Sequence, residues 1–331
     1  GSFVDALPNS VFSCLVVDLM KLKPATGCAR PRRIKRARQR GRTLVRHLML
    51  EQLEQKRLLA VFTVDSVADQ VDQNPGDGLC SVANGGGCTL RAAVMEANAW
   101  GTSLQPDRVV LPAGEYFFSL AGNGNLAGDL DITQSMVLVG AGSASTAVDA
   151  SGLDRVFDIR TGSVEIRGLT IRGGVVDDTE ALLDGTGGGV RNEGTLLIAD
   201  SVVTGNRATR GAGIGNYNGT LSVQRSVITG NGDAATQSGG GIENYSYYDP
   251  ASISVMDSTV SENRATSGGG INNHAYDGLA SAVITGSTIS GNNAEVGGGV
   301  ANRAVYYAEQ GTHASLSIVG STISGNVGST S

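Results

Sequence analysis

Beyond Lys56 the chain contains no lysine, and only 5% of its 331 residues are aromatic. Residues 1–57 carry 13 basic and 4 acidic side chains, a net charge of +9, whereas the remainder carries 12 arginines and 27 acidic side chains, a net charge of −15. Nucleic-acid-binding domains carry basic patches, so the acidic body excludes a nucleic-acid partner. The acidity is compatible with bound calcium, but no set of ligands stands out in the sequence, and we assign no cofactor.

Long apolar runs are also missing. The apolar stretch at residues 11–20 is short, contains Ser13 and Asp18, and precedes the basic run at residues 30–46. A membrane-spanning helix needs about 20 apolar residues, and a signal peptide has its basic residues first. We therefore expect no transmembrane helix, and we expect residues 1–60 to be a largely disordered basic leader rather than a folded domain.

Glycine, in contrast, is abundant, and five copies of one phrase organise the second half of the chain. Each copy opens with a glycine run that reaches an asparagine: GGGVRN (187–192), GAGIGN (211–216), GGGIEN (239–244), GGGINN (268–273) and GGGVAN (297–302). Each closes with a Ser-x-(Val/Ile)-(Thr/Ser)-x-Asn phrase, and the openings are 24 to 29 residues apart. This spacing is typical of repeat architectures.

Alternating apolar and polar residues between these phrases predict strands with one buried face. Aligning the copies gives three columns of β-branched residues, which begin at Val190, Ile198 and Val203. Three short strands per repeat, without an apolar period of helical length, indicate stacked parallel strands that bury their apolar sides against the turns above and below. The sequence therefore predicts an all-β fold, a single-stranded parallel β-helix, with clear rungs over residues 187–331.

Two columns of asparagine accompany the apolar columns. We interpret both as structural ladders at turns, because asparagine tolerates the left-handed backbone conformation and stacked amides can hydrogen-bond from rung to rung. The glycine runs fit corners that need a positive φ or a close approach of backbone. The ladder residues are Asn192, Asn216, Asn244, Asn273 and Asn302 in one column and Asn206, Asn231, Asn263, Asn292 and Asn326 in the other.

Two segments resemble motifs of exported proteins. LMLEQLEQKRLLAVF (48–62) resembles the N-terminal motif of planctomycetal extracellular proteins and implies export; the alternative is an amphipathic helix that covers the coil. CTLRAAVMEANA (88–99) resembles the CSLREA motif of β-helix proteins on bacterial surfaces, and this likeness continues over residues 61–331. It implies a right-handed, pectin-lyase-like solenoid outside the cell or on its surface. The GGGIxN phrase is similar to the repeats of polymorphic outer-membrane proteins, which supports the same placement.

The residues around this second motif predict a cap on the coil. Residues 90–99 combine strong helix formers with apolar side chains at positions 90, 93, 94 and 97. We expect a short amphipathic helix that covers the open N-terminal end, within a cap at about residues 61–105. Cys80 and Cys88 bracket the flexible loop SVANGGG, and in an exported protein we expect them to form a disulfide. Two thiols without a nearby histidine are too few ligands for a metal.

A catalytic constellation is harder to find. Glycoside hydrolysis needs two carboxylates that face one another across a cleft. The candidate acids are Asp177, Asp178, Asp249, Asp277 and Glu309. The Gly-His-Gly and Arg-x-Lys motifs of pectin hydrolases are absent, and we interpret His274 and His313 as loop residues without a partner. We assign no catalytic residue and no metal ligand; a polysaccharide lyase or a glycoside hydrolase acting on acidic polysaccharides is the alternative function.

The turn after each GGGxxN asparagine lengthens along the chain, and seven of the eight tyrosines lie in these turns. Because the rungs stack, we expect the turns to form one aromatic strip along an edge of the coil. Loops on a rigid scaffold are where binding concentrates, and tyrosine suits sugar rings or protein partners; shielding of glycine-rich turns is the alternative role. The strip comprises Tyr217, Tyr245, Tyr247, Tyr248, Tyr276, Tyr306 and Tyr307.

These observations favour a non-catalytic, adhesin-like rod that is extracellular or attached to the cell surface. We expect it to bind a polysaccharide or a cell-surface protein through the tyrosine strip. The chain stops at NVGSTS, directly after the fifth closing phrase and without a cap sequence, so we expect it to continue as part of a longer protein.

Overall fold

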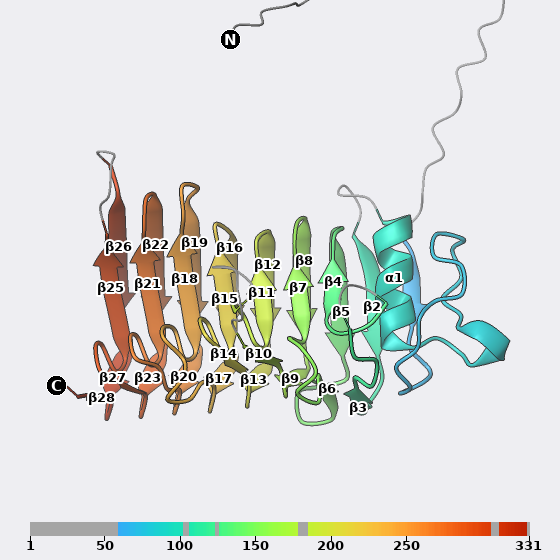
Figure 1. The fold of residues 1–331 in the computed structure, drawn as a ribbon, viewed down its shortest axis with the longest axis horizontal. Coiled ribbons are helices and arrows are strands. Elements are labelled where there is room, and N and C mark those ends of the chain that lie inside the picture. Colours follow the sequence, from blue (N-terminus) through green and yellow to red (C-terminus); the bar gives the residue numbers. More distant parts are fainter. Residues whose placement is uncertain (1–58, 102–105, 123–125, 178–184, 306–310, 330–331) are drawn as a thin grey trace, which may run out of the picture. The chain divides into compact units, whose positions relative to one another are not determined.

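The computed structural model describes residues 59–101, 106–122, 126–177, 185–305 and 311–329. In them the chain winds into a coil of strands that stack turn upon turn (Figure 1). Three sheets run along the coil, and within them each strand pairs in parallel with its equivalent in the next turn. The predicted all-β parallel β-helix is therefore confirmed, while its right-handedness stays a prediction. The predicted leader lies outside the described residues, apart from its last two positions.

The three long sheets contain most of the strands. The nine-stranded sheet consists of β1 (Val61–Thr63), β2 (Asp107–Leu111), β5 (Met136–Gly140), β8 (Ser163–Arg167), β12 (Thr195–Ala199), β16 (Thr220–Gln224), β19 (Ala251–Met256), β22 (Leu279–Thr285) and β26 (His313–Val319). The seven-stranded sheet consists of β4 (Leu130–Ile132), β7 (Phe157–Ile159), β11 (Val190–Asn192), β15 (Ile214–Tyr217), β18 (Ile242–Ser246), β21 (Ile271–Ala275) and β25 (Val300–Ala304).

The remaining strands lie in one long and two short sheets. The eight-stranded sheet consists of β3 (Gly114–Phe117), β6 (Thr146–Asp149), β9 (Thr170–Arg172), β13 (Val202–Thr204), β17 (Val227–Thr229), β20 (Thr259–Ser261), β23 (Thr288–Ser290) and β27 (Thr322–Ser324). Two pairs, β10 (Val175–Val176) with β14 (Arg207–Ala208) and β24 (Asn293–Ala294) with β28 (Val327–Gly328), complete the described strands.

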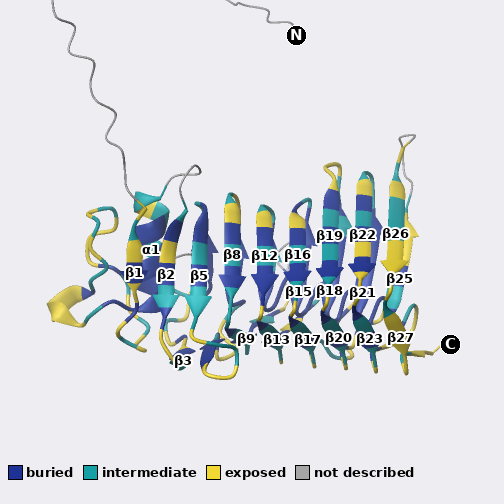
Figure 2. Cartoon of the chain, turned by 180° about the vertical axis from the view of Figure 1, so that it is seen from behind, coloured by how far each residue is buried: buried dark blue, intermediate teal, exposed yellow. Residues whose placement is uncertain are grey.

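The strand register reproduces the three predicted apolar columns. One column is Val190, Ile214, Ile242, Ile271 and Val300 in the seven-stranded sheet. The second is Ile198, Val223, Val255, Ile284 and Ile318, and the third is Val203, Ile228, Val260, Ile289 and Ile323. The columns are buried between the sheets except at the last turn, where β26 and β27 are largely exposed because no described turn covers them (Figure 2).

At the N-terminal end of the coil lies helix α1 (Leu90–Trp100), as the sequence predicted for residues 90–99 (Figure 1). The side chain of Thr89 caps its first turn by accepting a hydrogen bond from the amide of Ala92 at 3.1 Å. The apolar side chains at positions 90, 93, 94 and 97 belong to the same hydrophobic cluster as the first strands. Arg91, which is buried, forms an ion pair with Asp69 at 2.6 Å. The capping role of α1 stays a prediction.

The two asparagine columns form ladders of side-chain hydrogen bonds. In each, the amide nitrogen donates to the amide oxygen of the next rung, at 2.6–2.7 Å from Asn192 to Asn302 and at 2.9–3.0 Å from Asn206 to Asn326. The expected left-handed conformation is wrong for both columns. The first column lies within strands of the seven-stranded sheet, and in the second the left-handed residue is the one before the asparagine, usually glycine. Asparagine serves here for its paired donor and acceptor alone.

A disulfide joins Cys80 and Cys88, whose Cα atoms are 5.1 Å apart. The bridge closes a loop that contains a short 3-10 turn, Ala83–Gly85, beside the strands that begin the coil. No helix among the described residues is long and apolar enough to cross a membrane, in agreement with the sequence.

The ladder amides are buried and hydrogen-bond to one another in place of water. Removing one amide therefore leaves the amides of the two neighbouring rungs without one of their hydrogen-bond partners. Asn231 is fully buried; it donates to Val203 and Asn263 and accepts from Asn206. We expect Asn231→Ala to lower the free energy of unfolding by at least about 2 kcal/mol, measured by urea denaturation. The matched control is Asn293→Ala, an exposed asparagine that directly follows the ladder residue Asn292. An equal loss in both variants would contradict a stabilising role for the ladder.

Candidate functional site

The outer face of the seven-stranded sheet carries two rows of side chains that the glycine phrase positions. The first row is the residue before each ladder asparagine: Arg191, Gly215, Glu243, Asn272 and Ala301. The second row is the residue after it, which the register aligns as Tyr217, Tyr245, His274 and Arg303. Both rows point away from the apolar column because side chains alternate along a strand.

The first glycine of each run folds the preceding segment over this face. Gly239 has a φ of +61°, and a Cβ placed on it would lie 2.6 Å from the backbone nitrogen of Glu243. The chain therefore needs glycine here both for the left-handed conformation and for the close approach. As a result Ser238 and its equivalents, Arg210 and Ser267, form a wall in front of the first row, and Glu243 beneath it is fully buried.

Between this wall and the second row lies a cavity of about 490 Å³. Four tyrosine rings line it, those of Tyr217, Tyr245, Tyr247 and Tyr276. Tyr217 and Tyr245 are stacked with centroids 5.5 Å apart, and the rings of Tyr247 and Tyr276 lie 5.4 Å apart. The remaining lining includes Arg210, His274 and Arg303, so the cavity has aromatic walls and one basic side.

His274 fixes the character of that basic side. Its ring packs edge-on against Tyr245 at 5.0 Å, and its Nδ1 lies 3.2 Å from an Nη of Arg303. Arginine can only donate, so Nδ1 accepts and the imidazole proton must sit on Nε2. Burial, together with the positive charges of Arg303 and Arg210, lowers the pKa of His274 to about 3. The ring is therefore neutral at physiological pH and presents an Nε2–H donor.

Tyr217, Tyr245 and Glu243 also hold their protons more tightly than usual. Burial raises the pKa of Tyr217 to about 12 and raises that of Tyr245 still further. Burial raises the pKa of Glu243 to about 7, against the opposing effect of hydrogen bonds from Asn272, whose amide nitrogen lies 2.9 and 3.0 Å from the two carboxylate oxygens, and from Ser238. These shifts suit a binding cavity better than a proton-transfer site, because neither Tyr217, Tyr245 nor His274 is poised to accept a proton near pH 7.

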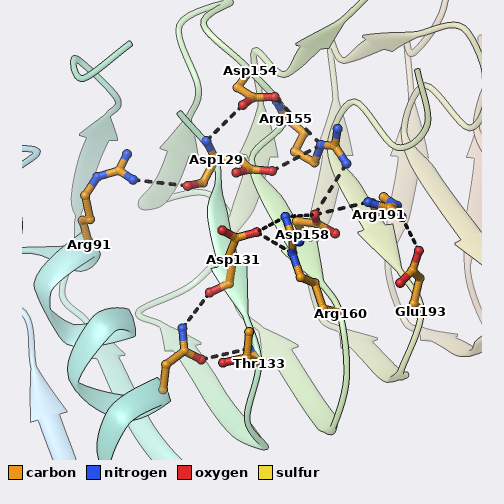
Figure 3. Close-up of polar contacts among 11 residues, drawn as sticks. Arg91, Asp129, Asp131, Thr133, Asp154, Arg155, Asp158, Arg160, Arg191 and Glu193 are labelled. Carbon is orange, nitrogen blue, oxygen red and sulfur yellow. Dashed lines mark hydrogen bonds and ion pairs between the residues drawn. The ribbon is translucent and has the colours of Figure 1, made fainter. Parts of the chain in front are cut away.

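A second polar cluster lies on earlier strands of the same sheet, and the sequence analysis missed it. Asp129, Asp131 and Asp158 bring carboxylate oxygens within 4.8 Å of one another (Figure 3). Arg155, Arg160 and Arg191 surround them, with Arg160 2.8 Å from Asp131 and 3.2 Å from Asp158. Burial, with Asp154 as the next largest cause, raises the pKa of Asp129 to about 7.

This cluster could offer oxygen ligands to a hard cation such as calcium. The three arginines, however, already supply the compensating positive charge, and a cation would be repelled by them. The arrangement is therefore better described as a buried ion-pair network across β4, β7 and β11 than as a metal centre.

Several predicted positions are corrected by the structure. His274 is not a partnerless loop residue: it lies in β21, where the tyrosine strip and Arg303 hold it. His313 begins strand β26 and is exposed. Tyr217 and Tyr245 lie in strands rather than in the inserted turns. Asp177 forms an ion pair with Arg207 at 2.9 Å, and Asp249 is exposed in a turn.

The structure brings five of the seven predicted tyrosines together. Tyr248 adds to the four that line the cavity, with its ring centroid 4.2 Å from that of Tyr247, and it is 65% exposed at a φ of +86°. A bulky residue at positive φ is a strained backbone position of the kind that gathers at functional sites. Tyr306, Tyr307, Asp178 and Glu309 lie outside the described residues.

A sequence signal for the missed residues exists in the repeats themselves. Glu243, Asn272 and Arg191 occupy the variable position inside the GGGxxN phrase, and His274 and Arg303 occupy the position directly after it. When the repeats are aligned, the position directly after the phrase forms a column that contains His274 and Arg303 together with Tyr217 and Tyr245.

Comparison with known proteins adds little to this geometry. No protein-family model matches the sequence, and no curated protein does. Among solved structures, the ORF18 protein of Geobacillus virus E2 is 14% identical with a TM-score of 0.39, over 71% of this chain and 50% of that one, so the chain spans half the length of the virus protein. The A-module of the mannuronan C-5 epimerase of Azotobacter vinelandii is 17% identical with a TM-score of 0.27, over 80% of this chain and 97% of that one. At these scores neither likeness bears on function.

The buried carboxyl of Glu243 predicts a pH-dependent stability. Because its pKa is higher in the folded than in the unfolded protein, the folded state holds the proton between about pH 4.5 and 7, and the free energy of unfolding falls as the pH rises through this window. We expect the free energy of unfolding of the wild type to fall by roughly 3 kcal/mol across this window because of Glu243, and we expect this fall to be absent in Glu243→Gln. Urea denaturation at pH 4.5, 6 and 8 measures it, with the exposed Glu295→Gln as control. Parallel curves for wild type and Glu243→Gln would contradict the shift.

For the aspartate cluster we expect no dependence on calcium, because arginines balance its charge. The melting temperature of the full chain should be the same in calcium chloride and in a chelator. A rise on adding calcium that is lost in Asp158→Asn would instead identify the cluster as a cation site.

Proposed function

We propose that the coil is a non-catalytic carbohydrate-binding part of an exported, adhesin-like surface protein, and that the tyrosine cavity is its binding site. The hollow between four tyrosine rings carries this proposal. Rings that merely shielded glycine turns would pack against them, whereas these four rings line the cavity. Aromatic walls with a few convergent polar groups are typical of small-ligand sites, and tyrosine offers a face for a sugar ring and a hydroxyl for its edges.

The scaffold around the cavity supports binding rather than chemistry. Strands of the seven-stranded sheet hold Tyr217, Tyr245 and His274 in register, so the site needs little ordering when a ligand arrives. Tyr217, Tyr245 and His274 offer hydrogen-bond donors and aromatic faces to the cavity, and none of the three is a base near neutral pH.

Export is supported by two independent features. The Cys80–Cys88 disulfide is typical of an oxidising compartment. The segments at residues 48–62 and 88–99 resemble motifs of extracellular and surface proteins. A polysaccharide or a glycosylated surface protein is accordingly the kind of partner that we propose.

A polysaccharide lyase or hydrolase is the second candidate, and one observation favours it. Asp129, with a pKa of about 7, lies in a cluster of acids on the same sheet face, and raised carboxyl pKa values gather at active sites. Against it, all three carboxylates are less than 10% exposed and each is paired with an arginine.

The full chain should retain polysaccharides without shortening them. Incubation with neutral and acidic polysaccharides, followed by mass spectrometry of the soluble products and affinity electrophoresis, separates the two candidates. Retention without new oligosaccharides supports the binding function, whereas chain shortening that is lost in Asp129→Asn would make the protein an enzyme.

Among tyrosine variants, Tyr247→Ala should weaken retention about tenfold, the loss of roughly 1.4 kcal/mol of ring contact. Tyr248→Gly should weaken it too, while the free energy of unfolding rises by up to about 1 kcal/mol because glycine relieves the positive φ. The control is Phe117→Ala, an exposed aromatic residue on the eight-stranded sheet. Unchanged retention in both tyrosine variants would overturn the proposed site.

A further inference from the structure

The Nε2–H group of His274 is a buried donor that the protein itself does not satisfy. The side chain is 7% exposed, lines the cavity, and its Nε2 has no hydrogen-bond partner among the described residues. A buried donor without a partner is destabilising, and native proteins keep few of them without a reason. Nε2 has almost no exposed surface, so a ligand in the cavity does not reach it, whereas Nδ1 accepts a hydrogen bond from Arg303 and orients that arginine at the cavity.

The charge of the lining points to the kind of ligand that the cavity would bind. The two charged side chains that line the cavity are both arginines, Arg210 and Arg303, although the chain beyond residue 57 has a net charge of −15. Arg210 also lies over the ring of Tyr245, with 5.8 Å from its guanidinium carbon to the ring centroid. Glu243, the nearby acid, is fully buried and hydrogen-bonded to Asn272, so it does not face the cavity.

We propose that the cavity selects acidic sugars, with the carboxylate of a uronic acid held by Arg303, which His274 positions, and the sugar ring packed against the tyrosines. This rests on the proposed carbohydrate-binding function and specifies its ligand. Arg303 can only donate hydrogen bonds and always carries a positive charge, so it favours an acceptor that is negatively charged, which a carboxylate is and a sugar hydroxyl is not. The planar guanidinium fork matches a planar carboxylate in particular.

The test compares sugars that differ only in charge. Isothermal titration of the full chain uses oligogalacturonate, the same oligosaccharide fully methyl-esterified, and a sulfated galactan oligosaccharide. Because the ester lacks the negative charge, we expect oligogalacturonate to bind at least tenfold more tightly than the ester. Its affinity should fall as salt is added, because salt screens the attraction between the carboxylates and the arginines. The sulfated sugar should bind more weakly than the uronate.

Variants of the corner separate its two groups. Arg303→Gln and His274→Leu should each reduce the affinity for oligogalacturonate about tenfold and leave the affinity for the ester unchanged. His274→Gln should retain more of the preference, since its amide oxygen can accept a hydrogen bond from Arg303 as Nδ1 does. Arg264→Gln, an exposed arginine outside the cavity, is the matched control.

The outcomes distinguish this inference from the function beneath it. Equal affinity for acid and ester would overturn the carboxylate assignment and leave carbohydrate binding in place. Tighter binding of the sulfated sugar than of oligogalacturonate would likewise overturn it. So would equal losses of affinity in His274→Gln and His274→Leu if Arg303→Gln kept the full preference for the acid over the ester. Binding of none of the three sugars would remove the proposed function itself.

Discussion

Parallel strands in constant register force each position of the coil to stack on its own equivalent, and the rest of the structure depends on this constraint. A column of like residues is favourable when the residue is apolar, as in the column from Val190 to Val300. It is favourable for asparagine too, because one amide both donates and accepts. It is unfavourable for charge, because like charges one strand apart repel. Where acids do occupy a column, as Asp131 and Asp158 do, the next rung supplies Arg191, and Arg160 bonds across both.

The same constraint decides how much of the fold could be predicted from sequence. Residues that repeat in all five copies were assigned to the right columns, because a repeat shows its own register. The conformation of the asparagines could not be predicted in this way: the first ladder lies within strands, and in the second the preceding residue takes the left-handed conformation, glycine in four turns and Glu262 in one. Repetition locates a corner but does not say which of two adjacent residues bends there.

The candidate site was predictable only in part, for a related reason. The tyrosines stand out because aromatic residues are rare in this chain, and five of them do gather. The sequence led to a wrong interpretation of His274, as a loop residue without a partner, and to none of Arg303, because each replaces a tyrosine in its column and so interrupts the aromatic pattern. The aspartate cluster lies in earlier turns, where the glycine phrase is absent and nothing in the sequence marks the strands β4 and β7 as neighbours.

The cavity owes its chemistry to the corner that precedes each strand. A glycine with positive φ lays the chain over the outer face of the sheet, removes water from Glu243 and His274, and shifts both toward their neutral forms. Glu243, which would be charged on an open strand, thereby retains a proton up to about pH 7, and His274 stays neutral well below it, while Arg303 beside them stays exposed and charged.

The asparagine ladders have a consequence for how such a coil can change during evolution. Each ladder amide donates a hydrogen bond to the following rung and accepts one from the preceding rung. These bonds keep the same geometry although the paired residues are 24 to 34 positions apart in the sequence. A duplication or deletion of one whole repeat would therefore restore every ladder bond at the junction. Gene recombination can lengthen or shorten this coil, and carry its cavity nearer to or farther from an end, without redesigning the interior.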